Sequence, residues 1–431
     1  MKIEDKQVGI FGLGHIGLPT AAILANNNIN VIGADINQKT VENINNGICS
    51  FKEPGLDELV KKSVMANKLK ATSNLEEAAK ISDIMIVIVP TPVDKNNEAD
   101  LSYVTSACKS IVKGIRKDNL IIIESTVPPE TGINIVKPIL EESGLKCGED
   151  FLLAYSPERA LPNNTIYEMT HNIRIVGGYN KKSAEYAASL YSYITQGDII
   201  QVKNMTSAEM VKLMENTYRD VNIALANEFA LLCEKINVDA NEVITSANYH
   251  PRVNIHTPGP GVGGHCIPVD PYFLIELGNK VGVETPLLSS ARQVNNNMPE
   301  HVLNLIKEYG VLDSDYSIGI LGIAYKGNVD DIRETPSRNL IKLLKEYNVK
   351  IYAHDPFVSD EIIESFDVET AAFEDVLSCD CIVLMTDHDL YKTIKPDMLV
   401  NKFIISTRNI LNAEEFRQEG INYQAIGNIF Q

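Results

Sequence analysis

One cysteine stands in a glycine-rich loop where it could act as a nucleophile. The loop covers residues 259–270, with Cys266 near its middle and Asp270 four residues later. Glycines let the backbone approach a ligand closely and turn its N–H groups toward an anion. A thiol at such a turn can form a covalent intermediate with a carbonyl carbon. Taken alone, the loop is equally compatible with a surface turn that carries an incidental cysteine.

A second group of polar residues shares one face of a predicted helix. Lys212, Asn216 and Arg219 are spaced i, i+4 and i+7, which places them on one side at 3.6 residues per turn. Asparagine is a poor helix former, which argues against a merely solvated stripe. An amide beside an ammonium group can stabilise an oxyanion.

The predicted helix begins near Thr206 and continues to about Ile236. Thr206 and Glu209 have the spacing of a capping box. We expect the apolar residues opposite the polar face to pack in the core, namely Met210, Leu213, Met214 and Leu225.

Charged residues also stand at other predicted ligand-binding turns. After an apolar strand at 151–154, Glu158 could serve as a base and Arg159 as a substrate clamp. Arg252 is a candidate for bidentate phosphate recognition. His250, two residues earlier, is equally compatible with a structural role. Further along the chain, a third turn carries Tyr325, Lys326 and Arg333.

The elements around these residues begin with a dinucleotide fingerprint. An apolar strand at 7–11 is followed by a glycine-rich turn, a helix to about Asn27 and a strand at 30–34. The turn contains Gly12, Gly14, His15, Ile16 and Gly17. Asp35 follows the second strand at the distance expected of a Rossmann fold. Its carboxylate would accept hydrogen bonds from ribose hydroxyls and repel a 2′-phosphate, so NAD is favoured over NADP.

Two more buried strands are predicted at 84–89 and 120–124. The turns after them carry Thr91 and Thr126. Ligands of such sheets bind beyond the carboxyl ends of the strands, so both threonines are candidates for cofactor contact. Ordinary turn residues are the alternative.

The pattern returns in weaker form near the C-terminus. A strand at 318–321 and another at 350–353 lead to Asp355. We therefore predict an α/β fold with two Rossmann-like doubly wound domains joined by a central helical domain. The expected division is 1–203 for NAD, 204–305 for the helical domain and 306–431 for a different nucleotide.

The composition limits the classes of partner. A formal charge of −18 in 431 residues argues against nucleic acid and against an anionic membrane. No apolar stretch is long enough to span a membrane, and the charged start leads straight into a strand, so we expect a cytoplasmic protein without a signal peptide. Seven cysteines with no regular spacing indicate neither a disulfide framework nor a metal site.

Together these motifs resemble the UDP-glucose and UDP-N-acetylmannosamine dehydrogenases, a family of NAD-dependent nucleotide-sugar 6-dehydrogenases. The resemblance spans nearly the whole chain. It rests on five motifs in the expected order, at 12–17, 156–159, 212–216, 263–266 and 324–333.

The resemblance implies a four-electron oxidation that uses two NAD⁺ per sugar. The C6 alcohol becomes an aldehyde, Cys266 adds to it, a second hydride leaves to give a thioester, and water releases the uronic acid. An aldehyde carbon becomes a hydride donor again only after a nucleophile has made it tetrahedral.

The resemblance also implies roles for individual residues. Lys212 and Asn216 would stabilise oxyanions, Glu158 would handle the hydrolytic water, Asp270 would order the network near the lysine, and Thr126 would lie by the nicotinamide. Arg333 would face the NAD pyrophosphate. The implied UDP-sugar contacts are Arg159, Ala160, Lys212, Asn216, Arg219, His250, Arg252, Gly263, Tyr325, Lys326 and Arg408. Because Arg252 would reach a neighbouring subunit, a homodimer or larger homo-oligomer is expected.

The cysteine loop also bears on the sugar. His265 and Val269 stand where UDP-glucose dehydrogenases typically carry a small residue and a lysine. The expected substrate is therefore a UDP-N-acetylhexosamine, with UDP-N-acetyl-D-mannosamine first, UDP-N-acetylglucosamine second and UDP-glucose third. A two-electron hydroxyacid dehydrogenase and a nucleotide-binding protein without turnover are the alternatives from other functional classes.

Overall fold

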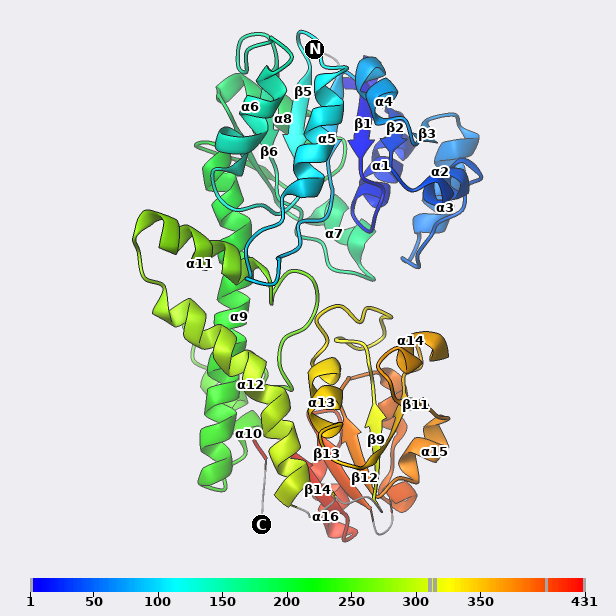
Figure 1. The fold of residues 1–431 in the computed structure, drawn as a ribbon, viewed down its shortest axis with the longest axis vertical. Helices are drawn as coiled ribbons and strands as arrows, with labels where there is room; N and C mark the ends of the chain where they lie inside the picture. Colours follow the sequence, from blue (N-terminus) through cyan, green and yellow to red (C-terminus); the bar gives the residue numbers. More distant parts are fainter. Residues whose placement is uncertain (1–2, 309–311, 313–315, 400–401, 429–431) are drawn as a thin grey trace. The chain divides into compact units, whose positions relative to one another are not determined.

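The computed structural model describes residues 3–308, 312, 316–399 and 402–428. The chain divides into two compact units. Unit 1 comprises Met1–Glu215 with Tyr272–Val281, and unit 2 comprises Asn216–Pro271 with Gly282–Gln431. Each unit contains one largely or wholly parallel β-sheet with helices packed beside it (Figure 1).

The sheet of unit 1 has eight strands in the order β3-β2-β1-β4-β5-β6-β7-β8. Neighbouring strands are parallel except for β6 and β7, which pair antiparallel. The strands are β1 (Gln7–Phe11), β2 (Asn30–Ala34), β3 (Leu69–Thr72), β4 (Ile84–Val87), β5 (Leu120–Ile123), β6 (Leu152–Tyr155), β7 (Arg174–Gly178) and β8 (Ile199–Val202). The predicted strands are confirmed, with ends that differ by one or two residues.

The central strands of this sheet are apolar and buried on both faces. Every residue of β4 and β5 is buried, as expected of parallel strands that helices cover from two sides. The covering helices are α1 (Gly17–Asn26), α2 (Gln38–Asn45), α3 (Leu56–Met65), α4 (Leu75–Ile81), α5 (Ser102–Val112), α6 (Lys137–Glu141), α7 (Thr165–His171) and α8 (Lys181–Tyr191). Strand order reverses between β1 and β4, and ligands of such sheets bind at that point.

The long helix α9 (Met205–Lys235) has nearly the predicted bounds, but the predicted capping box is wrong. The side-chain oxygen of Asn204 accepts a hydrogen bond from the N–H of Ser207 at 2.8 Å. Glu209 instead accepts the N–H groups of Glu130 and Gly132, at 2.7 and 2.9 Å. Glu209 therefore binds N–H groups that are distant in the sequence and does not cap the start of its own helix.

The prediction that the apolar face of α9 lies in the core is also wrong for two of its residues. Leu213 is buried, but Met214 and Leu225 are exposed. The polar face is the buried one, since Lys212 and Asn216 have 7% and 1% of their surface exposed.

Unit 2 contains a six-stranded, wholly parallel sheet in the order β11-β10-β9-β12-β13-β14. Its strands are β9 (Ser317–Leu321), β10 (Lys350–His354), β11 (Glu369–Thr370), β12 (Cys381–Leu384), β13 (Phe403–Ser406) and β14 (Asn422–Ala425). The helices after α9 are α10 (Ala240–Asn248), α11 (Asp270–Val281), α12 (Pro286–Glu308), α13 (Pro336–Leu344), α14 (Asp360–Glu364), α15 (Phe373–Leu377) and α16 (Ala413–Gln418).

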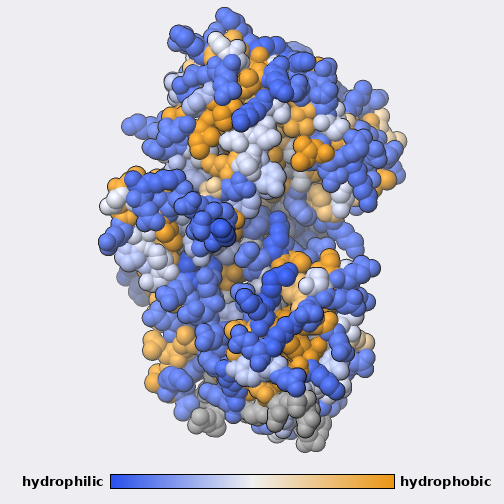
Figure 2. Space-filling view, in the orientation of Figure 1, coloured by the Kyte–Doolittle hydropathy of each residue, from blue (hydrophilic) through white to orange (hydrophobic). Residues whose placement is uncertain are grey.

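The predicted fold class is confirmed: two Rossmann-like sheets occur with a helical segment between them in the sequence. The division at residues 203 and 305 stays a prediction. The face shown in Figure 2 is mostly hydrophilic, with apolar residues in separate patches, in keeping with the formal charge of −18.

Candidate active site

The glycine turn after β1 has the geometry that a dinucleotide requires. Gly12 has φ of +100°, and a Cβ there would lie 2.0 Å from the carbonyl oxygen of Ile88. A Cβ at Gly17 would lie 1.9 Å from the carbonyl oxygen of Gly12. At Gly14 a Cβ would meet nothing within 4 Å, so the backbone there is open to a ligand. The three glycines thus fit the turn, close-packing and pyrophosphate-approach roles of the fingerprint.

Asp35 lies beside this turn, at the end of β2. One of its carboxylate oxygens accepts the N–H of Leu13 at 2.8 Å, and the other accepts the N–H of Asn37 at 2.9 Å. His15 and Ile16 lie on the same turn, with His15 exposed and its ring 4.2 Å from that of Phe51.

The two candidate threonines occur in neighbouring loops at the carboxyl edge of the sheet. Thr91 follows β4 and Thr126 follows β5, and both are half-buried. Ser125 joins the loops because its hydroxyl both donates to the carbonyl of Val89 and accepts its N–H, at 2.8 Å each. Together with the glycine turn and Asp35, these residues fit an NAD molecule at the β1–β4 switch point.

A buried ion cluster holds Glu158. Arg174, on β7, donates to Glu158 and to Glu124, and its Nε donates to the hydroxyl of Ser156 at 3.1 Å. Tyr191 donates its hydroxyl to Glu124, and its ring lies 4.3 Å from the guanidinium. One arginine therefore faces two glutamates inside unit 1.

The two glutamates of this cluster have opposite pKa shifts. Burial alone would raise both. For Glu158, Arg174 and the N–H groups of Arg159 and Ala160 outweigh burial and hold its pKa below the usual value. For Glu124 burial prevails and the pKa is raised. Glu158 is thus the carboxyl kept ionised.

Arg159 and Lys212 are placed by α9. Arg159 forms an ion pair with Glu215 at 2.8 Å and also donates to the carbonyl of Ile173. Lys212 lies one turn before Asn216 on the helix. The 212–216 motif thus lies on one continuous helix, and Arg159 is attached to that helix through Glu215.

In unit 2 the structure brings Asn216, Arg219 and Asp270 together. The amide nitrogen of Asn216 donates to the carboxylate of Asp270, and its oxygen accepts a hydrogen bond from Arg219. Asp270 is 2% exposed and starts α11. Its N–H donates to the carbonyl of Cys266 at 2.8 Å. The cysteine turn and the polar face of α9 are therefore linked directly.

The cysteine loop packs closely on the loop after β9. A Cβ at Gly263 would lie 2.4 Å from the Cβ of Tyr325. The N–H of Gly264, with φ of +90°, donates to the carbonyl of Arg333 at 2.9 Å. Only glycine allows this approach, which explains the glycine pair before Cys266.

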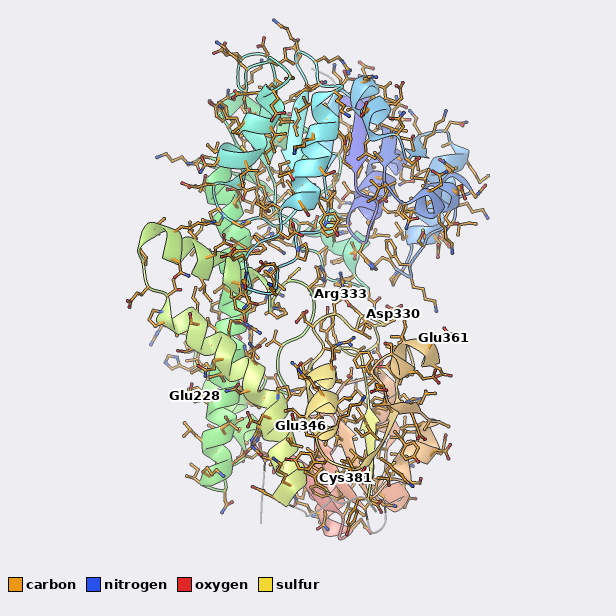
Figure 3. All side chains as sticks on the ribbon, viewed as in Figure 1. Glu228, Asp330, Arg333, Glu346, Glu361 and Cys381 are labelled. Carbon is orange, nitrogen blue, oxygen red and sulfur yellow. The ribbon has the colours of Figure 1, made fainter. Side chains whose placement is uncertain are left out.

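Arg333 and Tyr325 each interact electrostatically with Cys266. A fork of two hydrogen bonds joins Arg333 to Asp331, at 2.8 and 2.6 Å. This pairing raises the pKa of Arg333, and the negative charge of a Cys266 thiolate raises it further. Burial raises the pKa of Tyr325 to about 12. Figure 3 shows Asp330 and Arg333 on this loop.

The remaining predicted contacts differ in their surroundings. Arg408 donates to the carbonyls of Met385 and Tyr325, at 3.3 and 3.2 Å, and burial lowers its pKa. Lys326 is exposed on the loop after β9, next to Tyr325. His250 and Arg252 are exposed on the turn after α10 and contact each other at 3.4 Å.

Sequence reasoning missed Arg174, Glu124 and His388. A single arginine among the apolar residues of β7 is a signal of a buried charge, and it was overlooked. His388 follows the apolar strand β12 and contacts Asp355, 33 residues away along the chain, which no local pattern reports.

Within the described residues, no cluster of three or more His, Cys, Asp or Glu side chains is arranged to hold a metal ion. Over the same residues, no helix has the length and apolar character needed to cross a membrane. None of the seven cysteines, all of which lie within the described residues, forms a disulfide bond.

Comparison with known proteins covers nearly the whole chain. Three models of the UDP-glucose/GDP-mannose dehydrogenase family match: the NAD binding domain at residues 6–195, the central domain at 206–297 and the UDP binding domain at 319–413. A UDP-N-acetyl-D-mannosamine dehydrogenase of Methanococcus maripaludis is 43% identical, over 99% of this chain and 98% of the relative.

Solved structures give the same picture. The UDP-D-ManNAc dehydrogenase of Pyrococcus horikoshii superposes with a TM-score of 0.89 at 37% identity, covering 98% of this chain and 99% of the other. A UDP-glucose dehydrogenase of Pyrobaculum islandicum superposes with a TM-score of 0.90 at 26% identity, covering 98% of each.

Proposed function

Because the chain belongs to the UDP-glucose/GDP-mannose dehydrogenase family, we propose that it oxidises UDP-N-acetyl-D-mannosamine to UDP-N-acetyl-D-mannosaminuronate. It is an NAD-dependent nucleotide-sugar dehydrogenase that acts on the C6 alcohol. The observation that carries the choice of sugar is the full-length identity of 43% to a relative of that name. UDP-N-acetylglucosamine and then UDP-glucose are the alternatives.

NAD, when bound, supplies the hydride acceptor for both oxidations. The residues that hold it are the glycine turn at 12–17 and Asp35, with Thr91 and Thr126 at the neighbouring strand ends and Arg333 at the pyrophosphate. The chain's other residues orient the sugar and manage protons and oxyanions.

Cys266 forms the covalent bond to the sugar. Its sulfur adds to the aldehyde carbon while the thiol proton passes to the carbonyl oxygen. Loss of a hydride from that carbon and of the hydroxyl proton then leaves a thioester. Asn216 and Lys212, one turn apart on α9, stabilise the charged oxygen. Asp270 accepts a hydrogen bond from the Asn216 amide and fixes its direction.

Glu158 assists hydrolysis of the thioester. One oxygen of Glu158 accepts two N–H groups, and the other accepts Arg174. Since each carboxylate oxygen has two acceptor positions, one position on the second oxygen can orient a water. Water attacks the thioester carbon, its protons are released, the thiolate leaves and the acid forms.

A further set of residues is proposed to hold the UDP-sugar. Arg159, Arg219, Tyr325, Lys326 and Arg408 supply cationic and ring groups. The remaining proposed contacts are Ala160, His250, Arg252 and Gly263.

The family matches support a division into domains at 1–203, 204–305 and 306–431. The absence of disulfide bonds among the seven cysteines suits the reducing cytoplasm, where we place the enzyme.

The test of this function is a panel of UDP-sugars incubated with the purified chain and NAD⁺, followed by NADH absorbance. We expect rapid turnover of UDP-N-acetyl-D-mannosamine and slower turnover of the two alternatives. Rapid turnover of UDP-glucose together with inactivity toward both N-acetylhexosamines would overturn the assignment.

We also propose that the enzyme is a homodimer that pairs through α9. Tyr218, Leu225, Phe229 and Leu232 lie on one face of this helix and are 37–60% exposed. Their spacing of seven, four and three residues forms a continuous apolar stripe, and such exposed stripes mark interfaces. A two-fold axis would place the stripe against itself.

Analytical ultracentrifugation tests this assembly. The double variant Leu225→Asp/Leu232→Asp should sediment as a monomer where the unaltered chain sediments as a dimer. Ile81→Asp, which changes an exposed apolar residue at the end of α4, is the matched control and should remain dimeric. A dimeric double variant would remove α9 as the interface.

A further inference from the structure

The acidic residue at the end of β10 is placed differently from its counterpart in unit 1. Asp355 corresponds to Asp35 in chain order, after the second strand of its sheet. Asp35 is half-buried, but Asp355 is only 5% exposed. The carboxylate of Asp355 accepts hydrogen bonds from the N–H groups of Ile323, Ala324, Phe357 and Val358 and from the ring of His388. With its acceptor positions filled, Asp355 does not bind a ribose.

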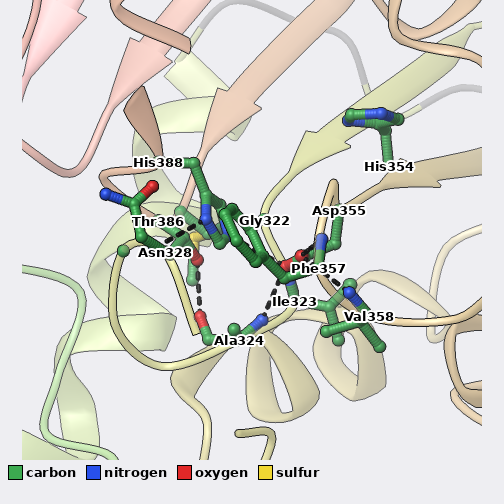
Figure 4. Close-up of polar contacts among 12 residues, drawn as sticks. Gly322, Ile323, Ala324, Asn328, His354, Asp355, Phe357, Val358, Thr386 and His388 are labelled. Atoms are coloured by element: carbon green, nitrogen blue, oxygen red, sulfur yellow. Dashed lines mark hydrogen bonds and ion pairs between the residues drawn. The ribbon is translucent and has the colours of Figure 1, made fainter. Parts of the chain in front are cut away.

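His388 connects this carboxylate to the loop after β9 (Figure 4). Its Nδ1 accepts the N–H of Asn328 at 2.9 Å, and its Nε2 lies 3.1 Å from a carboxylate oxygen of Asp355. A nitrogen that accepts an N–H carries no proton, so the proton resides on Nε2 and is donated to Asp355. The two contacts together select one tautomer.

The surroundings hold the ring in this orientation. The side chain of His388 is fully buried. The ring of Phe357 stacks on it, with centroids 5.2 Å apart, and Tyr391 meets it edge-on at 5.3 Å. Burial opposes ionisation of Asp355, but the His388 and backbone hydrogen bonds outweigh it and keep its pKa below the usual value. A charged acceptor therefore faces the ring.

The loop that His388 holds is the one that carries nucleotide contacts. Residues 324–334 include Tyr325, Lys326 and Arg333, and they support the cysteine loop through the Gly264 N–H. Asn328 stands at the middle of this loop with φ of +60°, a left-handed conformation that needs support. His388 supplies an acceptor to its backbone.

The turn that contains His388 fixes the same loop at three more points. The Thr386 hydroxyl donates to the carbonyl of Ala324 at 2.5 Å, and Asp387 accepts the N–H of Gly327 at 2.9 Å. Asp389 accepts the side-chain amide of Asn328 at 2.8 Å. His388 is the one described member of this turn that also reaches the end of β10, and so ties the loop to the sheet.

We propose that His388, held in a single tautomer by Asp355, is a positioning residue for the UDP-binding loop 324–334. It acts through the backbone of Asn328, so that Tyr325 and Lys326 meet the nucleotide in a fixed geometry. The proposal rests on the proposed function, because it assigns this loop to the UDP-sugar. Asp355 serves the nucleotide indirectly, as the group that fixes the histidine.

Two substitutions separate the halves of the histidine's role. His388→Asn places a side-chain oxygen near the position of Nδ1 and keeps the acceptor for Asn328. His388→Gln extends an amide toward Asp355 and loses that acceptor. We expect His388→Gln to weaken UDP binding and raise the KM for the UDP-sugar about tenfold, as loss of one buried hydrogen bond predicts. His388→Asn should stay within about threefold of the unaltered enzyme.

In His388→Gln the KM for NAD⁺ should rise less than the KM for the UDP-sugar, because Arg333 is the one residue of this loop assigned to NAD⁺. A general loss of folding would not separate the two values. His301→Gln is the matched control, since His301 also pairs with a carboxylate in unit 2, that of Glu234 at 3.1 Å, and should leave both KM values unchanged. UDP affinity by calorimetry and sugar turnover by NADH are measured separately. If the unaltered chain binds UDP but turns over no UDP-sugar, the proposed function fails while the loop proposal stands.

Equal UDP affinity in His388→Gln and the unaltered enzyme, or equal losses in the Gln and Asn variants, would overturn the proposal. If His388→Gln does not fold, the proposal is tested by hydrogen exchange of backbone amides in the unaltered chain. Slow exchange of the Asn328 amide without ligand supports a loop that is held in advance, and exchange at the rate of an open loop contradicts it.

Discussion

Replacing Arg174 by methionine should destabilise unit 1 severely at neutral pH. The arginine side chain is 5% exposed, and its partners Glu124 and Glu158 are 0% and 9% exposed. Removing one member of a buried ion pair costs about 3–5 kcal/mol, because the partner is left charged and unpaired. At about 2–4 °C per kcal/mol for a unit of this size, the melting temperature should fall by roughly 6–20 °C.

The loss of stability in Arg174→Met should depend on pH in a defined direction. In the unaltered chain Arg174 holds the pKa of Glu158 low, so the pair's contribution is present above the unfolded value of about 4.3 and is lost as pH falls below it. In Arg174→Met both glutamates are buried without a counter-ion, and protonation relieves them. The difference between the two proteins should therefore shrink as pH is lowered toward about 4.

Differential scanning calorimetry between pH 4 and 8 measures both effects. Lys181→Met is the matched control, because it removes an exposed pair with Glu185 at 3.6 Å and should cost less than about 1 kcal/mol. An Arg174→Met protein that melts within about 2 °C of the unaltered chain at pH 7 would refute the reasoning.

Three further predictions concern Glu209 and the glycines. Burial raises the pKa of Glu209 to about 7. Because the folded protein then binds this proton more tightly than the unfolded chain, the folded state loses stability as pH rises. The melting temperature should therefore decline from pH 5 to 8, and it should decline less in Glu209→Gln. Gly17→Ala, with a Cβ 1.9 Å from a carbonyl oxygen, should lower the melting temperature, whereas Gly14→Ala should melt normally and raise the KM for NAD⁺. Gly263→Ala, whose Cβ meets that of Tyr325 at 2.4 Å, should destabilise the chain by about 1–3 kcal/mol and lose sugar turnover; normal turnover would contradict the loop contact.

The parts of the fold with local causes could be predicted from sequence. The glycine turn, Asp35 and the apolar strands β4 and β5 were identified because each follows from adjacent residues. The bounds of α9 followed from its periodicity in the same way. The candidate residues at these elements also lie where they were expected. Thr91 and Thr126 follow their strands, and Cys266 lies in the glycine-rich turn.

The failures come from partners distant in the sequence. Glu209 satisfies the N–H groups of Glu130 and Gly132 instead of capping α9, and nothing near it in the chain indicates this. The burial of the polar face of α9 follows from what packs on it, so Met214 and Leu225 were assigned to the wrong side. A helix with one polar and one apolar face does not reveal which face meets the protein.

The central claim is that Cys266 carries the sugar through a second oxidation as a thioester. The most direct measurement is the yield of NADH and of uronic acid per UDP-N-acetyl-D-mannosamine in Cys266→Ala beside the unaltered enzyme. We expect two NADH and one acid per sugar from the unaltered enzyme, and no acid from the variant. A Cys266→Ala protein that forms the acid at the unaltered rate would contradict the covalent mechanism.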